Sequence, residues 1–143
     1  MASPALCYGI PNIQLPRVGG DAINPCAFVG HELVVFFCPS DAAEAEDEIA
    51  SYRCRLPDFE EAGAWVMGIV IGRSFLPSAC EIAIATDPGG EGWAAFESLL
   101  DRSERSAEAG GGVFLFGRGG CLTRAWTGAG HAGEVVEALR RRD

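Results

Sequence analysis

Cysteine is the residue type that best equips this sequence for chemistry, because six copies are spread along its 143 residues. Cys38 is the most informative of them, since it ends an apolar run and directly precedes Pro39 and the start of an expected helix. A helix N-terminus stabilises a thiolate, so the Cys38 thiol is a candidate nucleophile. In the alternative interpretation, it is a small apolar residue that fills the end of a strand. The other cysteines stand at positions 7, 26, 54, 80 and 121.

The remaining cysteines give weaker signals. Cys54 lies between Arg53 and Arg55, which would activate it if it were exposed, and it shares with Cys80 the possible role of a resolving or sensor thiol. For Cys54 we favour a partly buried helix position. No Cys-x-x-Cys pair is present, so zinc ribbons and dithiol redox sites lose their main support. An even number of cysteines permits a disulfide framework, but a chain of this size does not need one and shows no secretory signal. We therefore expect a cytoplasmic protein with mostly reduced thiols.

An acidic segment follows Cys38 and contains Glu44, Glu46, Asp47 and Glu48. Paired carboxylates can act as general acid and base, but no second carboxylate cluster faces this one in the expected topology. The segment suits the first turns of a helix, where each negative charge contributes about 0.3–1 kcal/mol. The same carboxylates would raise the pKa of a nearby thiol. We therefore expect these carboxylates to lie in solvent on the first turns of a helix.

Composition excludes several other function classes. The chain has 11 arginines and no lysine, which rules out a Schiff-base lysine and a P-loop lysine. His31 and His131 are its only histidines, and we expect both at the surface, so a multi-histidine metal site is not expected and neither is a cofactor. The net charge of −9 argues against nucleic acid and anionic membranes as partners. The longest apolar stretch, residues 62–72, is far shorter than a membrane span.

Apolar spacing predicts the elements that must position these groups. Residues 33–38 and 64–71 are continuous apolar runs, which are typical of strands buried on both faces. Ser40 or Asp41 can cap a helix that Pro57 interrupts and restarts, and Gly63 ends the second piece. The apolar stripe of that helix is Ala45, Ile49, Tyr52 and Leu56. Further predicted elements are a small hairpin of residues 13–15 and 22–24, a short helix at 75–80, a strand at 82–85, a helix over 91–103, a hairpin of 113–116 and 122–126, and a closing helix over 134–141.

This order of elements predicts an α/β protein. Strands that alternate with helices, followed by a hairpin and a last helix, indicate a three-layer sandwich with a mixed central sheet, helices on both faces and an N-terminal β-hairpin. That is the plan of a thioredoxin-like fold. We find no internal repeat and no linker, so residues 1–143 form a single domain. Trp65, Trp93 and Trp126 lie on apolar faces and are expected in the core.

Three separated segments carry a family resemblance. They are Leu15-Pro16 with Gly20-x-x-Ile23 and the run 30–39, then Phe59-x-x-x-Gly63-Ala64-x-Val66, and finally Val113-Phe-Leu-Phe-x-x-x-Gly120. Across residues 11–140 the sequence resembles the peroxiredoxin family of alkyl hydroperoxide reductases and thiol-specific antioxidants. The resemblance implies a thioredoxin-like fold and an antioxidant oxidoreductase. It also implies pairing as a homodimer, in which one of the tryptophans could lie at the interface.

The resemblance also implies where the chemistry would lie. Family members carry Pro-x-x-x-Thr-x-x-Cys after the first core strand, where the cysteine attacks peroxide, and the threonine and a distant arginine position the substrate. Pro39 matches the proline, but Ala43 occupies the threonine position and Glu46 the peroxidatic position. The arginine expected just before the strand at 113 is missing, because residues 109–112 read Ala-Gly-Gly-Gly. No cis-proline of the thioredoxin type precedes that strand.

Three functional interpretations follow. In the first, the chain is a divergent peroxiredoxin-like protein without ordinary peroxidase activity, with a redox-associated binding or regulatory role toward a small molecule or a protein. In the second, it is an active thiol oxidoreductase that uses a displaced cysteine, Cys38 being the first choice. In the third, it is a structural interaction domain whose acidic helix docks a basic partner. The missing threonine, cysteine and arginine favour the first.

Overall fold

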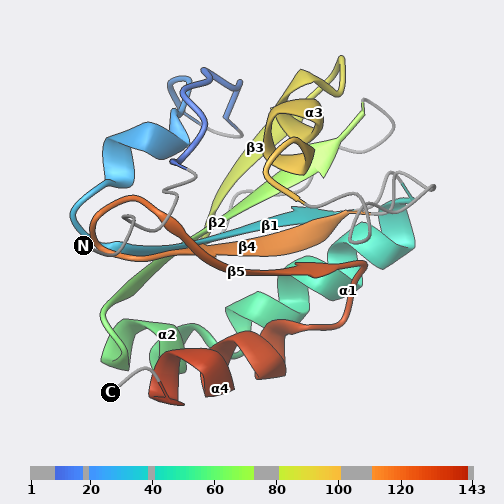
Figure 1. Ribbon diagram of the computed structural model, residues 1–143. Helices are drawn as coiled ribbons and strands as arrows, with labels where there is room; N and C mark the ends of the chain where they lie inside the picture. The colour runs from blue at the N-terminus through green and yellow to red at the C-terminus, as the bar shows by residue number, and fades with distance from the viewer. Residues whose placement is uncertain (1–8, 18–19, 39–40, 73–80, 101–110, 142–143) are drawn as a thin grey trace, which may run out of the picture.

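A central mixed sheet organises the computed structural model, which describes residues 9–17, 20–38, 41–72, 81–100 and 111–141 (Figure 1). Within these residues the sheet has five strands in the order β3-β2-β1-β4-β5. The first three strands run parallel, whereas β4 is antiparallel to β1 and β5 is antiparallel to β4. The strands are β1 (Glu32–Cys38), β2 (Ala64–Ile71), β3 (Ala83–Asp87), β4 (Gly112–Phe116) and β5 (Leu122–Thr127).

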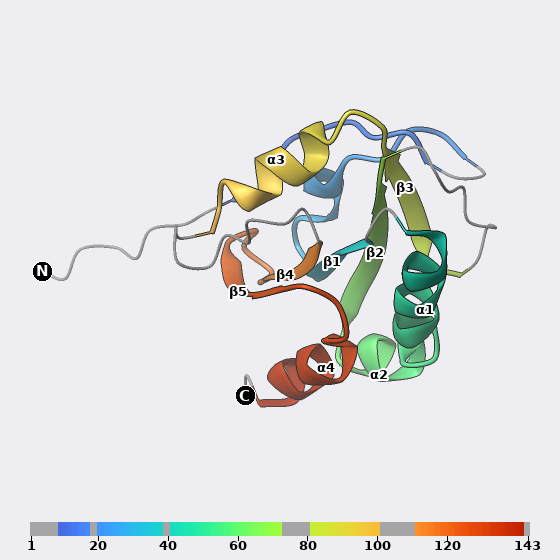
Figure 2. The ribbon, with the colours of Figure 1, turned by 90° about the vertical axis from the view of Figure 1, so that its right-hand side faces the viewer.

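Helices cover both faces of this sheet, which confirms the predicted layering. On one face lie α1, α2 and α4, and on the other lies α3 with the N-terminal segment (Figure 2). Each face encloses its own apolar core, and β1 is buried along its whole length because it contributes to both. The helices are the 3₁₀-helix η1 (Pro25–Phe28), α1 (Ala42–Arg53), α2 (Leu56–Glu61), α3 (Glu91–Glu97) and α4 (Ala132–Arg141). No helix of the described residues is long and apolar enough to cross a membrane.

Local chemistry fixes the ends of the helices. The Asp41 side chain accepts a hydrogen bond from the backbone N–H of Glu44 at 3.0 Å and caps α1, as predicted. Pro57 lies in the first turn of α2, where backbone N–H groups make no hydrogen bond within the helix, so proline is tolerated there. The buried Asp87 carboxylate caps α3, since it accepts from the N–H groups of Gly92 at 3.0 Å and Trp93 at 2.8 Å.

Three details differ from the predictions. The N-terminal hairpin is reduced to one antiparallel bridge between Leu15 and Ile23, closed by two backbone hydrogen bonds of 2.9 Å. The helix expected over 91–103 ends at Glu97. Trp65 was expected in the core but is 51 % exposed, and its ring centroid lies 5.6 Å from that of Phe28 and 5.7 Å from that of His31. The short helix expected at 75–80 lies outside the described residues.

Candidate functional site

The chemistry that the family motif implies would take place where β1 ends and α1 begins. Cys38 is the last residue of β1 and is fully buried in the core beneath α1. Pro39, the matching motif proline, lies outside the described residues. The structure therefore brings Cys38 to the expected junction, but it turns the thiol inward instead of toward solvent.

Burial also decides the protonation state of Cys38. Loss of hydration, with a smaller contribution from the Glu48 carboxylate, raises the pKa of its thiol to about 12. The thiolate is the nucleophilic form of cysteine, and a thiol with this pKa is almost entirely protonated at neutral pH. The surroundings of Cys38 are those of a structural cysteine.

Glu48 differs from the rest of the acidic segment. We expected it on a solvated helix start, but it is only 4 % exposed and faces the interior beside Ile49 and Tyr52. Its carboxylate accepts a hydrogen bond from the backbone N–H of Gly130, at 3.1 Å to Oε1 and 3.4 Å to Oε2. Burial raises the pKa of Glu48, whereas the Gly130 N–H and His131 act in the opposite direction. Glu48 is thus a tether between α1 and the loop that leads into α4.

Tyr52 completes this buried group. Its ring stacks on Phe36 with centroids 4.0 Å apart, and its hydroxyl is buried without a hydrogen-bond partner among the described residues. Burial raises the pKa of Tyr52 further above its ordinary value, and Glu48 and Cys38 act in the same direction. A thiol, a carboxyl group and a phenol therefore lie near one another in an apolar interior, where all three favour their neutral forms.

The motif positions on α1 itself face outward. Ala43 and Glu46 are exposed, as are Glu44 and Asp47. Glu46, at the peroxidatic position, therefore presents a carboxylate to solvent on α1. The three exposed acidic residues form the outer surface that was expected, and Glu48 is not part of it.

The start of β4 is closed to side chains at Gly111 and Gly112. Gly111 has a φ of +91°, and a Cβ atom there would lie 2.6 Å from the carbonyl oxygen of Phe37. At Gly112 a Cβ atom would lie 2.6 Å from the carbonyl oxygen of Trp126. Both obstacles are backbone atoms of neighbouring strands, so they cannot swing away as a flexible side chain would. No arginine fits at either position without movement of the sheet.

Comparisons with known proteins find similarity to peroxiredoxins. No protein-family model matches the chain. It is 26 % identical to peroxiredoxin Bcp of Xanthomonas campestris pv. campestris over 152 aligned positions, which cover 96 % of this chain and 92 % of the relative. The chain is peroxiredoxin-like. The predicted resemblance is therefore confirmed across almost the whole sequence.

Solved structures establish the fold of this peroxiredoxin-like protein. A structure of the X. campestris bacterioferritin comigratory protein, described for its alkyl peroxide reduction activity, matches with a TM-score of 0.72 and 24 % identity over 89 % of this chain and 88 % of that one. The mitochondrial 2-Cys peroxiredoxin of Plasmodium falciparum matches with a TM-score of 0.69 and 17 % identity over 94 % and 92 %. Together they confirm the thioredoxin-like fold that the order of elements predicted.

The other described cysteines of the peroxiredoxin-like chain differ in their surroundings. Cys54 is a free thiol at the C-terminal end of α1 and is exposed, not partly buried as expected. Its Sγ lies 3.6 Å from Nη1 of Arg55 and donates to the carbonyl oxygen of Ser51 at 3.3 Å. Cys26 is free and half-buried. Cys121 is disulfide-bonded, so the expectation of mostly reduced thiols fails for it. Cys7 and Cys80 lie outside the described residues.

The two histidines differ in their surroundings. His31 is exposed, as expected. His131 is only partly exposed and joins β5 to α4, with Nε2 2.8 Å from the carbonyl oxygen of Thr127 and Nδ1 3.0 Å from Glu134. Within the described residues no group of three or more histidine, cysteine, aspartate or glutamate side chains could hold a metal ion.

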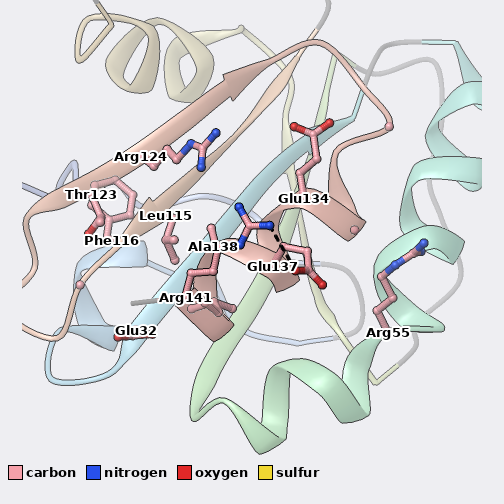
Figure 3. A pocket seen from close by; sticks show the side chains of 14 residues that line it. Glu32, Arg55, Leu115, Phe116, Thr123, Arg124, Glu134, Glu137, Ala138 and Arg141 are labelled. Carbon is pink, nitrogen blue, oxygen red and sulfur yellow. Dashed lines mark ion pairs between the residues drawn. The ribbon is translucent and has the colours of Figure 1, made fainter. Parts of the chain in front are cut away.

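A groove of about 750 Å³ is the feature that sequence reasoning missed (Figure 3). It lies between α4 and the β4–β5 hairpin and reaches Arg55 at the α1–α2 junction. We call it the α4 groove; its lining includes Glu32, Arg55, Leu115, Phe116, Thr123, Arg124, Gly133, Glu134, Glu137, Ala138, Leu139 and Arg141. No local pattern marks it, because its walls come from four segments that are distant in sequence.

Proposed function

We propose that this peroxiredoxin-like protein lacks ordinary peroxidase activity and serves as a redox-associated binding module. The observation that carries the proposal is Glu46, an exposed carboxylate on α1 at the place where the family motif has its thiol. Peroxidase chemistry of this family begins with oxidation of a thiolate to a sulfenic acid. A carboxylate has no sulfur to be oxidised, so that step has no acceptor at position 46.

Two further features support the proposal. Gly111 and Gly112 leave no space for an arginine that would bind peroxide and stabilise a thiolate. Cys38 is the thiol nearest to the motif, yet its burial and its pKa of about 12 leave it protonated. A displaced nucleophile at Cys38 would need the end of β1 to open before it could react.

Oxidation of each cysteine tests the proposal directly. The fully reduced protein is exposed to stoichiometric hydrogen peroxide, alkylated at successive times, and examined by mass spectrometry for each of its six cysteines. We expect slow oxidation without a strong preference, and no effect of the Cys38→Ser substitution on the time course. Rapid oxidation of one cysteine far ahead of the rest would contradict the proposal and identify that residue as the nucleophile.

A second candidate function rests on Cys54. This thiol is exposed, and its Sγ lies 3.6 Å from Nη1 of the Arg55 guanidinium. Reactive cysteines share these two conditions, access to solvent and a cationic neighbour. The chain would then be a thiol oxidoreductase that reacts with disulfides. Under this alternative, Cys54→Ser abolishes the fastest reaction with an aromatic disulfide reagent, whereas Cys26→Ser leaves it unchanged. Equal rates for the wild type and Cys54→Ser would exclude it.

The proposal includes a homodimer in the cytoplasm. Trp65 supports a contact between two copies, because half of this large apolar side chain is exposed beside the Phe28 ring. If this surface forms the contact, Trp65→Ser converts a dimer to a monomer in sedimentation equilibrium, and the monomer keeps the circular dichroism spectrum of the folded wild type. A wild-type protein that sediments as a monomer would remove the dimer from the proposal.

A further inference from the structure

The α4 groove has the dimensions and the floor of a site for a small molecule. Its volume of about 750 Å³ lies within the range of about 300–1,000 Å³ that is usual for such sites. Leu115, Phe116 and Leu139 form an apolar part of its lining. Glu32, the first residue of β1, also lines it, so the groove lies at the opposite end of β1 from Cys38. It is therefore a different place from the motif at the start of α1.

Two guanidinium groups in the groove have no carboxylate partner among the described residues. Arg124 lies across the β4–β5 ladder from Leu115, and its guanidinium carbon is 4.7 Å from the centre of the Trp126 ring. Arg55 donates to neutral acceptors, the carbonyl oxygen of Ser51 at 3.1 Å and its hydroxyl at 3.3 Å. Figure 3 shows these two arginines on opposite sides of α4. A cation that borders an apolar floor and lacks a counter-ion is suited to the head of an organic anion.

The carboxylates of α4 in the groove are already engaged. Glu134 lies 3.0 Å from Nδ1 of His131, and Glu137 pairs with Arg140 at 3.5 Å and with Arg141 at 3.9 Å. They do not neutralise Arg124 or Arg55. Their negative charge nevertheless opposes a doubly charged ligand, so a carboxylate fits the groove better than a phosphate monoester does.

We propose that the α4 groove binds a small organic monocarboxylate with an apolar body. The carboxylate pairs with Arg124, and the body lies along Leu115, Phe116 and Leu139. Arg55 contributes from the other side of α4 through its charge. The proposal rests on the proposed function in one respect, since it names the ligand class of a binding module.

Titration with octanoate tests the proposal on the full-length protein. Amide resonances are followed by two-dimensional NMR, and we expect saturable shifts at Thr123 and Gly133, which line the groove, and none at Glu46 on α1. Octanamide has the same body without charge and should bind at least about tenfold more weakly. Octyl phosphate should also bind more weakly than octanoate. Tighter binding of octyl phosphate would overturn the choice of a carboxylate, and shifts confined to Trp65 and its neighbours would overturn the site.

Variants separate the arginine contact from a general surface effect. Arg124→Gln should weaken octanoate binding about tenfold and Arg55→Gln by a smaller factor, whereas Arg124→Lys should recover part of the affinity. The matched control is Arg118→Gln, an exposed arginine in the same hairpin that does not line the groove. Equal affinities for Arg124→Gln and Arg118→Gln would refute the site. These affinities are independent of the peroxide experiment, so either proposal can fail while the other stands.

Discussion

Glu48 offers a quantitative test of how a buried carboxylate shapes this protein. Its side chain is 4 % exposed, and the N–H of Gly130 is its hydrogen-bond donor among the described residues. Because burial raises the pKa of Glu48 above its unfolded value, the folded state holds the proton more tightly than the unfolded state does. The free energy of unfolding therefore falls as the pH rises through the interval between the two pKa values. Each unit by which the pKa is raised corresponds to about 1.4 kcal/mol of that loss.

Two substitutions at this position separate charge from hydrogen bonding. Glu48→Gln keeps an oxygen that can accept from Gly130 but carries no charge. We expect it to match the wild type near pH 4 and to be the more stable protein near pH 8. Glu48→Ala removes the acceptor of the part-buried Gly130 N–H, at about 0.5–1.5 kcal/mol, and a buried methylene worth about 0.8 kcal/mol. Its deficit of about 1–2 kcal/mol should be largest at low pH and shrink as the charged wild type loses stability.

Urea unfolding from about pH 4 to about pH 8 measures these differences. Asp47→Asn is the matched control, because it removes an exposed carboxylate from the same helix and leaves the buried one in place. The reasoning is refuted if Glu48→Gln becomes less stable than the wild type as the pH rises. That result would mean that the Gly130 N–H and His131 stabilise the charge by more than burial destabilises it.

Three other substitutions follow from the packing and the motif. A Cβ atom on Gly68 would lie 2.5 Å from Cζ of Phe36, so Gly68→Ala should cost about 1–3 kcal/mol in urea unfolding, whereas Gly119→Ala, which meets open space, serves as a neutral control. Glu46→Cys should not gain rapid peroxide consumption in a thiol-coupled assay, because none of the described arginines and histidines forms an ion pair at position 46; a rate far above that of the wild type would contradict this account. Trp65→Ala should change the free energy of unfolding by less than about 1 kcal/mol, since half of the ring is exposed, and a larger loss would show that its contacts are structural.

The strands of the sheet could be predicted well because each core strand is a continuous apolar run in the sequence. The run 64–71 was placed with its observed bounds, and Asp41 and Pro57 act as the helix signals indicated. Glu48 could not be placed in the same way. The acidic residues before it, Glu44, Glu46 and Asp47, are exposed, whereas Glu48 contacts Gly130, which is 82 residues away in the chain.

The same limit applies to the candidate sites. Cys38 was correctly placed at the end of a strand, but its access to solvent depends on how α1 covers it, which no local pattern records. Trp65 belongs to the same apolar run as its neighbours in β2, yet its side chain is exposed while theirs are buried. The α4 groove exists only where α4 crosses the β4–β5 hairpin, so it depends on tertiary packing alone.

The glycines before β4 bear on how this sequence can change over evolutionary time. A thiol at position 46 is accessible by substitution of one residue, but an arginine at 111 or 112 would meet a carbonyl oxygen 2.6 Å from its Cβ atom. Accommodating it requires displacement of a neighbouring strand, which a single exchange does not provide. A side chain at either position therefore costs stability before it can bring any gain in binding, which favours the retention of glycine at 111 and 112.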